Sequence, residues 1–352
     1  MKYVTVLLAF VPISIVGSLL HWDDRLVFFG SALGIVPLAW VLGKATEELA
    51  ARTGPRVGGL LNATLGNAAE LIITIFAIRE GLLELVKASI TGSILGNLLL
   101  VLGLSVLLGG LRNRTQCFDR SEAGLNATMM VLALIALIIP SIFGHAIEVE
   151  NLAAVEWLSL GVALVMIVIY VLSLVFSFVS ASGEALSQGH AKATFSLRRS
   201  AMVLVVAALF VAWLSEILVS TVEPVVESLG ITEFFLGVIL IPLVGNVAEH
   251  LVAVQAALKN NMNLSLAISF GSSMQIALFV APLLVFVSLA MGHPLTLIFN
   301  QFELLALGAA AGIAGLISLD GESNWLEGAQ LLAVYVILAL AFFFLPTGGP
   351  GL

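Results

Sequence analysis

The sequence predicts an all-α membrane protein with eleven transmembrane helices. Hydrophobic residues make up 60% of the 352 residues and charged residues only 10%, whereas soluble domains carry about 25% charged residues. Several apolar runs exceed the roughly 20 residues that a helix needs to cross a bilayer. Because these runs are continuous instead of alternating, a membrane β-barrel is excluded.

Charge and cysteine content exclude other classes of protein. The formal net charge is -8, and no basic cluster is interleaved with aromatic residues, so binding to nucleic acid is not indicated. Cys117 is the single cysteine, and it therefore provides neither an internal disulfide nor a cysteine metal cage. The partner that composition predicts is the lipid bilayer.

Breaks rich in charged or turn-forming residues separate the spans. The first span follows Lys2 like a signal peptide, but polar residues come directly after it without a small-residue cleavage site. We therefore expect an uncleaved helix. The eleven predicted spans are residues 4–20, 26–50, 57–79, 84–109, 122–142, 154–179, 201–223, 231–258, 264–291, 296–318 and 326–345.

A motif inside two of these spans is repeated. Gly66-Asn67-Ala68-Ala69-Glu70 recurs as Gly245-Asn246-Val247-Ala248-Glu249, 179 residues later. The same offset relates Gly92-Ser93 to Gly271-Ser272, and with a gap Trp157-Leu158 resembles Trp325-Leu326. Spans two to six therefore match spans seven to eleven, which indicates an internal duplication.

This duplication predicts the organisation of the chain. Residues 1–22 form an extra N-terminal transmembrane helix, 23–181 the first five-helix repeat, 182–200 a cytoplasmic linker loop and 201–352 the second five-helix repeat. Since each repeat has an odd number of spans, the two copies enter the membrane from opposite sides. Inverted repeats of this kind are typical of secondary transporters.

The distribution of Lys and Arg predicts the orientation, because cytoplasmic loops carry an excess of them. With the N-terminus inside, three of these residues lie outside, namely Arg25, Arg79 and Lys87, and Lys44 lies in a span. The cytoplasmic side then holds Lys2, Arg52, Arg56, Arg112, Arg114, Arg120, Lys192, Arg198, Arg199 and Lys259. A multi-pass protein with a cytoplasmic N-terminus and an outside C-terminus follows.

The repeated motif is the candidate metal site. Asn67 and Glu70 are three residues apart and share a helix face, as do Asn246 and Glu249. A carboxylate is costly in hydrocarbon, so two in matched positions indicate function. The preceding glycines, with Pro242 before the second motif, let the helix open. Hard cations such as Ca²⁺ prefer such all-oxygen ligands.

A polar pair in the following span of each half extends this candidate site. Ser93 and Asn97 are four residues apart and share a face, and Ser272 and Gln275 are three apart and do so too. In apolar helices these groups need partners, and the neighbouring carboxylates are suitable ones. We expect them to support the cation site or to act as weak ligands.

The sequence allows more than one role for most of the other titratable residues in or near the spans. Glu216 is either a further proton or cation site or a polar bridge, since its counterpart in the first half is Pro37. Glu303 is interpreted as structural, and His250 as either a proton sensor or a packed side chain. Four acidic residues lie near the ends of spans, where they either line an entry path for ions or are simply solvated; they are Glu47, Glu48, Glu223 and Glu227.

The motifs resemble those of a known family. Gly66–Leu71 and Gly245–His250 look like the two signature repeats of the calcium/proton exchanger (CAX) family, within the cation/Ca²⁺ exchanger superfamily. The segments 271–277 and 324–328 are similar to later parts of that family. The likeness covers nearly the whole chain. Between spans six and seven, however, the acidic helix of many members is missing, since Glu184 is the only acid there.

The resemblance implies one extra helix followed by two inverted five-helix repeats, and antiport of Ca²⁺ against H⁺ by alternating access. Glu70 and Glu249 would be the central acids, with Asn67 and Asn246 beside them. Ca²⁺ and protons would be the transported substrates, and no cofactor is implied. The short chain favours a cell membrane over an organelle.

Three alternatives differ in mechanism. A Na⁺-driven Ca²⁺ exchanger or another cation/H⁺ antiporter of the same fold would use a similar site, although the Na⁺-driven relatives usually have Pro-Glu where both motifs here have Ala-Glu. An intramembrane hydrolase is disfavoured because no His-Glu-x-x-His or Gly-x-Ser-x-Gly pattern is present. A channel is disfavoured because matched acids in inverted repeats suit alternating access.

Overall fold

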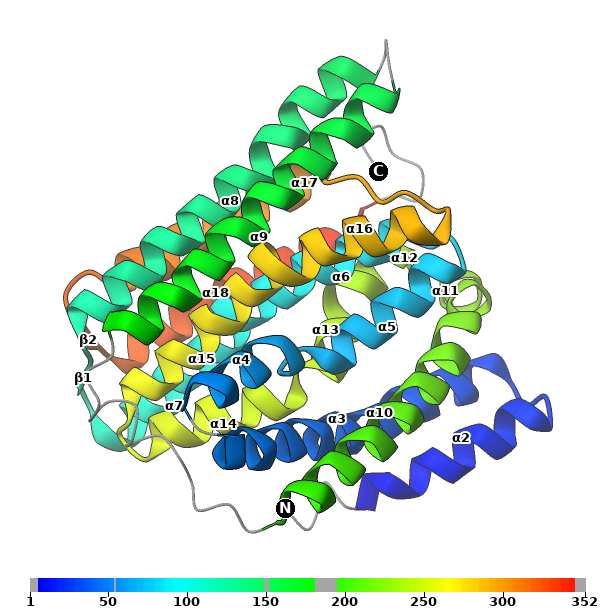
Figure 1. Ribbon diagram of the computed structural model, residues 1–352, viewed down its shortest axis with the longest axis horizontal. Helices are drawn as coiled ribbons and strands as arrows, with labels where there is room; N and C mark the ends of the chain where they lie inside the picture. The colour runs from blue at the N-terminus through cyan, green and yellow to red at the C-terminus, as the bar shows by residue number, and fades with distance from the viewer. Residues whose placement is uncertain (1–5, 54, 149–151, 181–194, 346–352) are drawn as a thin grey trace.

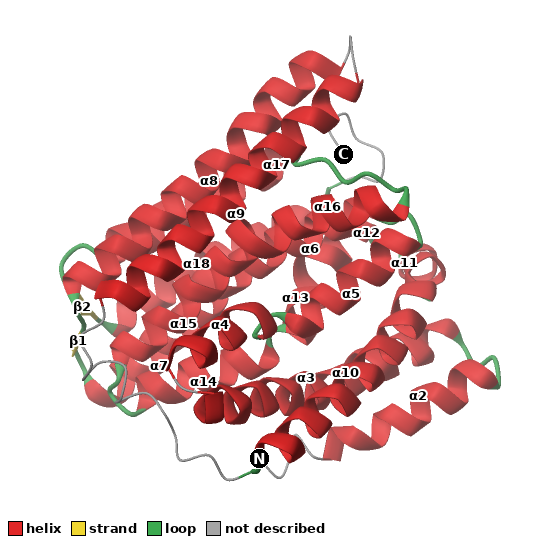
Figure 2. Ribbon diagram, viewed as in Figure 1, coloured by secondary structure: helices red, strands yellow, loops and turns green. Residues whose placement is uncertain are grey.

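The computed structural model describes residues 6–53, 55–148, 152–180 and 195–345, and these are almost entirely helical (Figures 1 and 2). Its first half contains η1 (Leu7–Ala9), α2 (Phe10–Leu19), α3 (Asp24–Thr53), α4 (Pro55–Leu65), α5 (Ala68–Arg79), α6 (Leu83–Leu95), η2 (Gly96–Val101), α7 (Leu102–Asn113), β1 (Gln116–Cys117), α8 (Arg120–Glu148) and α9 (Leu152–Ser180). Its second half contains α10 (Leu197–Ser220), α11 (Val222–Leu229), α12 (Glu233–Phe235), η3 (Leu236–Leu240), α13 (Ile241–Gly245), α14 (Val247–Leu258), α15 (Met262–Gln275), η4 (Ile276–Val280), α16 (Ala281–Met291), α17 (Gln301–Ile317), β2 (Glu322–Ser323) and α18 (Trp325–Phe343).

Seven helices among the described residues are long and apolar enough to cross a membrane, or eight if one strongly bent pair counts as a span. That pair, α11 with Glu233–Gly245, bends by 112°. Each of the eleven predicted spans falls on helical segments, but some are short or divided. The membrane class predicted from composition is confirmed.

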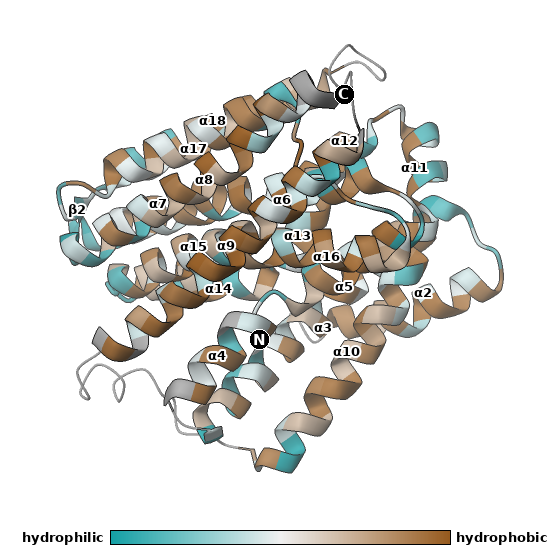
Figure 3. Ribbon diagram, turned by 45° about the horizontal axis from the view of Figure 1, so that its top comes forward, coloured by the Kyte–Doolittle hydropathy of each residue, from teal (hydrophilic) through white to brown (hydrophobic). Residues whose placement is uncertain are grey.

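Most residues of the outer helices, such as α9 and α10, are hydrophobic (Figure 3). On α9 and α10, for example, Val179, Leu209 and Val165 are mostly exposed. In water this surface would be unfavourable, but a helix that is apolar all round suits a membrane. The exposed residues therefore face lipid, and the polar centre has to lie between the helices.

Helices from the two halves of the chain lie side by side. In Figure 1, α10 (green) packs along α3 (blue), and α2 packs against both. A Cβ at Gly34 of α3 would lie 2.8 Å from Leu214 Cδ1 of α10, so the absence of a side chain lets these helices approach closely.

Matched irregularities occur in the two halves. One predicted span is divided at Gly66–Asn67 between α4 and α5, and another at Asn246 between α13 and α14. The π-helical turns η2 and η4 interrupt α6–α7 and α15–α16 at equivalent positions. Such turns are frequent at functional sites.

A short strand pair joins the halves at one face of the molecule. β1 pairs antiparallel with β2, with Gln116 opposite Ser323 and Cys117 opposite Glu322. The Gln116 side chain also donates to the Ala257 carbonyl oxygen at 2.9 Å. We call this the strand face; the opposite one, where α5 ends and α6 begins, is the α5–α6 face.

Two predicted boundaries were wrong. Residues 292–300 form an extended segment, so the span predicted from 296 begins as a helix only at Gln301, where Asn300 and Glu303 build a capping box. The linker predicted at 182–200 lies mostly outside the described residues, and its end already belongs to α10. Ser196 caps that helix by accepting a hydrogen bond from the Arg199 N–H.

Candidate cation site

The two repeated motifs form matched helix breaks in the middle of the bundle. Asn67 is the N-cap of α5 and Asn246 the N-cap of α14, and neither side chain is used for capping. Glu70 and Glu249 follow in the first turn of these helices. The positive end of each helix dipole therefore lies beside a carboxylate, which stabilises negative charge there.

Glu70 is sealed inside the protein, with only 3% of its surface exposed. Its Oε1 accepts hydrogen bonds from the Ser93 hydroxyl and from Asn246 Nδ2, the latter at 2.5 Å. Its Oε2 is buried and has no hydrogen-bond partner among the described residues. One carboxylate oxygen is therefore available for a cation or a proton.

Glu249 has a similar partner but lies closer to solvent. The Ser272 hydroxyl contacts Glu249 Oε2 at 2.5 Å and Asn67 Oδ1 at 3.3 Å, and it accepts from Asn97 Nδ2 at 3.0 Å. A hydroxyl has a single proton to donate, and the shorter contact assigns that proton to Glu249.

Residues of both halves interlock around the two carboxylates. Asn246 of the second half reaches Glu70 of the first, and Asn67 Nδ2 donates to Gln275 Oε1 at 2.9 Å. A Cβ at Gly245 would lie 2.7 Å from Glu70 Cγ. The glycine of the second motif thus leaves room for the glutamate of the first.

The structure gathers eight of the nine predicted site residues into two neighbouring hydrogen-bonded clusters, which together we call the cation network. One cluster contains Glu70, Ser93 and Asn246. The other contains Glu249, Ser272, Asn67, Asn97 and Gln275. Glu216 lies apart from both clusters and pairs with Arg79 at 3.3 Å, with both side chains at least half exposed. His250 is also outside the network, and its buried Nε2 has no partner among the described residues.

The network offers two carboxylates together with neutral amide and hydroxyl groups. In the described part of the chain, no group of three or more His, Cys, Asp or Glu side chains could hold a metal ion. Glu70 and Glu249 carry the acidic oxygens of the network, and the amides and hydroxyls carry neutral oxygens. Oxygen ligands of this kind suit hard cations.

A cavity of about 470 Å³ leads to this network from the strand face. Its inner end reaches Glu249, Ser272 and Gln275, and its outer part is lined by exposed residues that include Lys44 and Gln255. Glu47, which the sequence placed on a possible access path, lines it as well. Glu70 is not part of the lining, so Glu249 is the first of the two motif carboxylates reached from this side.

Close helix packing closes the other side. Gly92 of α6 lies against the backbone of Val238 in η3, and Gly237 of η3 lies against Ala88 of α6. Any Cβ at Gly92 would overlap backbone atoms of Val238. In this conformation the network is accessible from the strand face and closed toward the α5–α6 face.

Another buried acid was interpreted as structural from the sequence. Glu303 is only 1% exposed, and it accepts a hydrogen bond from Thr91 Oγ1 at 2.9 Å. The Asn300-x-x-Glu303 spacing is a capping-box pattern that could have located the start of α17. Its contact with Thr91 is not readable from the sequence.

Comparisons with known proteins agree with the fold and the motifs. The family described as sodium/calcium exchanger protein matches residues 25–179 and 199–344. The chain is 47% identical to the Ca²⁺/H⁺ antiporter of Aphanothece halophytica, over 97% of this chain and 96% of that protein. It is 44% identical to the Ca²⁺/H⁺ antiporter ChaA of Bacillus subtilis (strain 168), over 95% of this chain and 97% of that one. The solved structure of native YfkE superposes with a TM-score of 0.87 at 42% identity, covering 97% of this chain and all of that one.

Proposed function

Because this chain belongs to the sodium/calcium exchanger protein family, we propose that it is a secondary antiporter that exchanges Ca²⁺ for H⁺ across a membrane. Two relatives described above, from Aphanothece halophytica and Bacillus subtilis, are Ca²⁺/H⁺ antiporters, which supports this cargo. The observation that carries the proposal is the pair of carboxylates from different halves, each held by neutral groups. Glu70 accepts from Asn246 of the other half. Glu249 accepts from Ser272, which also contacts Asn67 of the other half.

The proposed architecture has eleven membrane crossings: one extra helix in 1–22, then two inverted five-helix repeats. The first repeat is 23–181, the second begins with α10, and a cytoplasmic linker between α9 and α10 joins them. The matched breaks beside Asn67 and Asn246 support this architecture, and so do the equivalent π-helical turns η2 and η4.

Coupling arises from the cost of buried charge. Two ionised carboxylates without a counterion are unfavourable in a medium of low dielectric constant. Binding of Ca²⁺ cancels both charges, and so does binding of two protons. Only these loaded forms pass through the closed intermediate, so each turnover exchanges one cargo for the other. Asn67 and Asn246 supply further cation ligands, and Ser93 and Ser272 orient the carboxylates. Asn97 and Gln275 in turn hold Ser272 and Asn67.

In the proposed orientation the strand face is cytoplasmic, because it carries most of the Lys and Arg residues. The N-terminus is then inside, the C-terminus outside, and the cell membrane is the proposed location. The cavity that reaches Glu249 opens toward the cytoplasm, so the structure represents an inward-open state that receives Ca²⁺ for export.

Transport by purified protein in liposomes tests the function. With Ca²⁺ outside and an acidic lumen, a pH gradient alone is expected to drive uptake of radioactive Ca²⁺, and a protonophore is expected to stop it. The family description also names sodium, so a Na⁺ gradient is the second candidate driving force. Uptake that requires Na⁺ and ignores the pH gradient would reject proton exchange.

Thiol labelling tests the orientation. Gln255 lines the cavity and Glu80 is exposed at the α5–α6 face. In a Cys117→Ser background, a membrane-impermeant reagent is expected to label Gln255→Cys only from the cytoplasmic side of vesicles. The matched variant Glu80→Cys is expected to react only from the outside. The reverse pattern would show that the orientation is inverted.

A further inference from the structure

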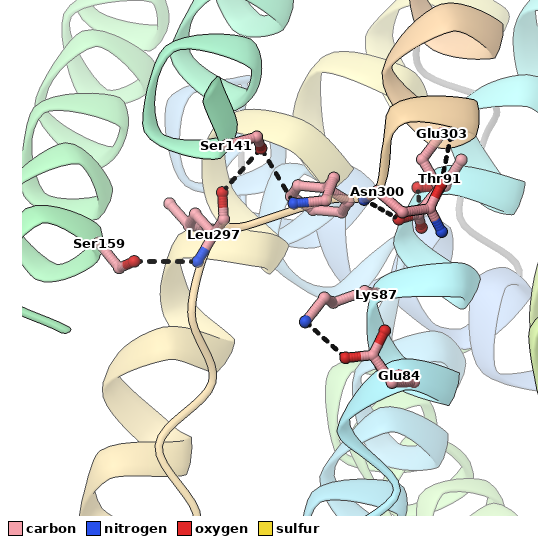
Figure 4. Close-up of polar contacts among 9 residues, drawn as sticks. Glu84, Lys87, Thr91, Ser141, Ser159, Leu297, Asn300 and Glu303 are labelled. Carbon is pink, nitrogen blue, oxygen red and sulfur yellow. Dashed lines mark hydrogen bonds and ion pairs between the residues drawn. The ribbon is translucent and has the colours of Figure 1, made fainter. Parts of the chain in front are cut away.

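From Leu295 onward, the extended segment between α16 and α17 is largely buried, although it has no helical hydrogen bonds of its own. Non-helical backbone at membrane depth is tolerated where protein groups satisfy it. Every second backbone N–H group of the segment, from Leu295 to Phe299, donates a hydrogen bond to a serine hydroxyl of another helix or of α16. Figure 4 shows the bonds to Ser159 and Ser141. The pairs are Leu295 with Ser288 at 2.8 Å, Leu297 with Ser159 at 3.1 Å and Phe299 with Ser141 at 2.9 Å.

This segment ends at the buried carboxyl of Glu303. The Asn300 N–H donates to Glu303 Oε2 at 2.8 Å, and Thr91 Oγ1 donates to Oε1 at 2.9 Å (Figure 4). In the same cap, Asn300 Nδ2 is buried without an acceptor among the described residues. Glu303 is thus a membrane-embedded carboxyl whose direct partners are all neutral.

A polar stripe on α6 connects this carboxyl with the α5–α6 face. Glu84, Lys87 and Thr91 are spaced by three and four residues, so they share one face of the helix. Side-chain exposure falls from 57% at Glu84 to 13% at Lys87, and Thr91 is fully buried. Lys87 and Glu84 form an ion pair at 2.7 Å. Figure 4 shows this pair on α6, the helix that also carries Thr91.

Glu303 is separate from the cation network. Thr91 and Ser93 are two residues apart, which places them about 200° apart around α6. Ser93 contacts Glu70, and Thr91 contacts Glu303 on the opposite face. The same helix therefore touches the cation site on one side and the second buried carboxyl on the other.

The surroundings of Glu303 suit a proton better than a metal ion. Both of its oxygens accept hydrogen bonds, and its direct partners offer one hydroxyl oxygen and no second carboxylate for a metal ion. Thr91 serves either protonation state, because its hydroxyl can donate to a carboxylate or accept from a carboxylic acid. Since Lys87 is paired with Glu84, no ion pair neutralises Glu303, and protonation is the simple way to remove its charge.

The charged groups around this site come from α6 and from the elements that pack against α17. Glu84 and Lys87 are the described charges that act on Glu303. Of the other elements that pack against α17, η2 carries no charged residue, and α18 and the start of α8 place Glu327, Arg120 and Glu122 near the far end of α17. That end is about 25 Å away along a 17-residue helix. The other end of α8, which carries His145 and Glu148, lies beside the extended segment, where Gly144 packs against Ile298.

We infer that Glu303 is a second proton-binding site, reached from the α5–α6 face along Glu84, Lys87 and Thr91, and that its protonation controls the position of α6. The inference rests on the proposed function, in which this face is outside. A proton from the external water binds the Glu303 carboxylate, and the Thr91 hydroxyl turns from donor to acceptor. The α6 helix, which carries the Ser93 donor to Glu70, thereby responds to external pH.

The test compares two glutamates that occupy the same position of a capping box. Glu303 and Glu327 are both capping-box partners, of Asn300 and Asn324 respectively, and glutamine preserves that role. In oriented proteoliposomes, the rate of pH-gradient-driven Ca²⁺ transport is measured against external pH. In Glu303→Gln, we expect the slope of log rate against external pH to become shallower by about one, because one titrating proton is lost.

Each outcome of this comparison is informative. The half-saturating Ca²⁺ concentration of Glu303→Gln should stay close to wild type, and Glu327→Gln should keep the wild-type slope. An unchanged slope in Glu303→Gln, or equal changes in both variants, would reduce Glu303 to a helix cap. If Glu303→Gln does not fold, Lys87→Gln is expected to shift the same profile, and an unshifted profile overturns the inference. Failure of the proposed function would appear separately, as absent transport in the wild-type protein.

Discussion

Replacing Glu70 or Glu249 by glutamine is expected to lower pH-gradient-driven Ca²⁺ transport by roughly 100-fold or more. The amide has nearly the same size, so the hydrogen-bonded network around Ser93 and Ser272 has partners of similar shape. The variant has only one negative charge to balance Ca²⁺ in a closed site. An unbalanced buried charge costs about 3 kcal/mol or more, and glutamine also cannot return a proton.

Initial rates of radioactive Ca²⁺ uptake, normalised to folded protein by size-exclusion chromatography, measure this effect. Glu80→Gln is the matched control, since Glu80 is an exposed glutamate at the end of α5 and its replacement changes the net charge equally. That control should transport normally. Normal uptake by Glu70→Gln or Glu249→Gln would remove the central pair from the mechanism.

Gly92→Ala is expected to open the protein toward the α5–α6 face. The new Cβ would lie 2.6 Å from Val238 Cα, and because this neighbour is backbone, α6 and η3 must separate. Overpacking of this kind costs about 1–3 kcal/mol, and a shift of about 2 kcal/mol changes the ratio of two conformations roughly 30-fold. We expect a conformation open to the outside and slow transport.

Gly96→Ala provides the matched control on the same continuous helix, because no atom lies within 4 Å of a Cβ there. Opening is measured by external thiol labelling of Leu85→Cys, a position that is buried against Gly237. Labelling should rise with Gly92→Ala and stay low with Gly96→Ala. If Gly92→Ala leaves both labelling and transport unchanged, the contact between Gly92 and Val238 does not close the protein toward the α5–α6 face.

Local sequence signals predicted the membrane class and the members of the cation network. Continuous apolar runs identify helices regardless of their neighbours, and the repeated Gly-Asn-x-x-Glu pattern singled out Glu70 and Glu249 because buried acids are costly. The glycine before each asparagine also indicated where the helices break. These features depend on residues within one turn of each other.

The parts that were not predicted depend on distant residues. Asn246 reaches Glu70 across 176 positions of sequence, and Glu216 meets Arg79 across 137, so no local pattern reveals either pair. The apolar residues Leu295–Phe299 read as part of a helix, but serines from remote helices stabilise them in an extended form. Composition alone does not distinguish these two conformations.

The strand pair between β1 and β2 has a consequence for how such a molecule changes shape. This strand pair connects the two halves of the chain at the strand face, and the packing of α3 against α10 connects them a second time. If each half moved as one rigid body relative to the other, both of these contacts would have to break. We therefore expect the moving units to be mixed bundles, with pivots at the joints where α3 meets α4 and α10 meets α11.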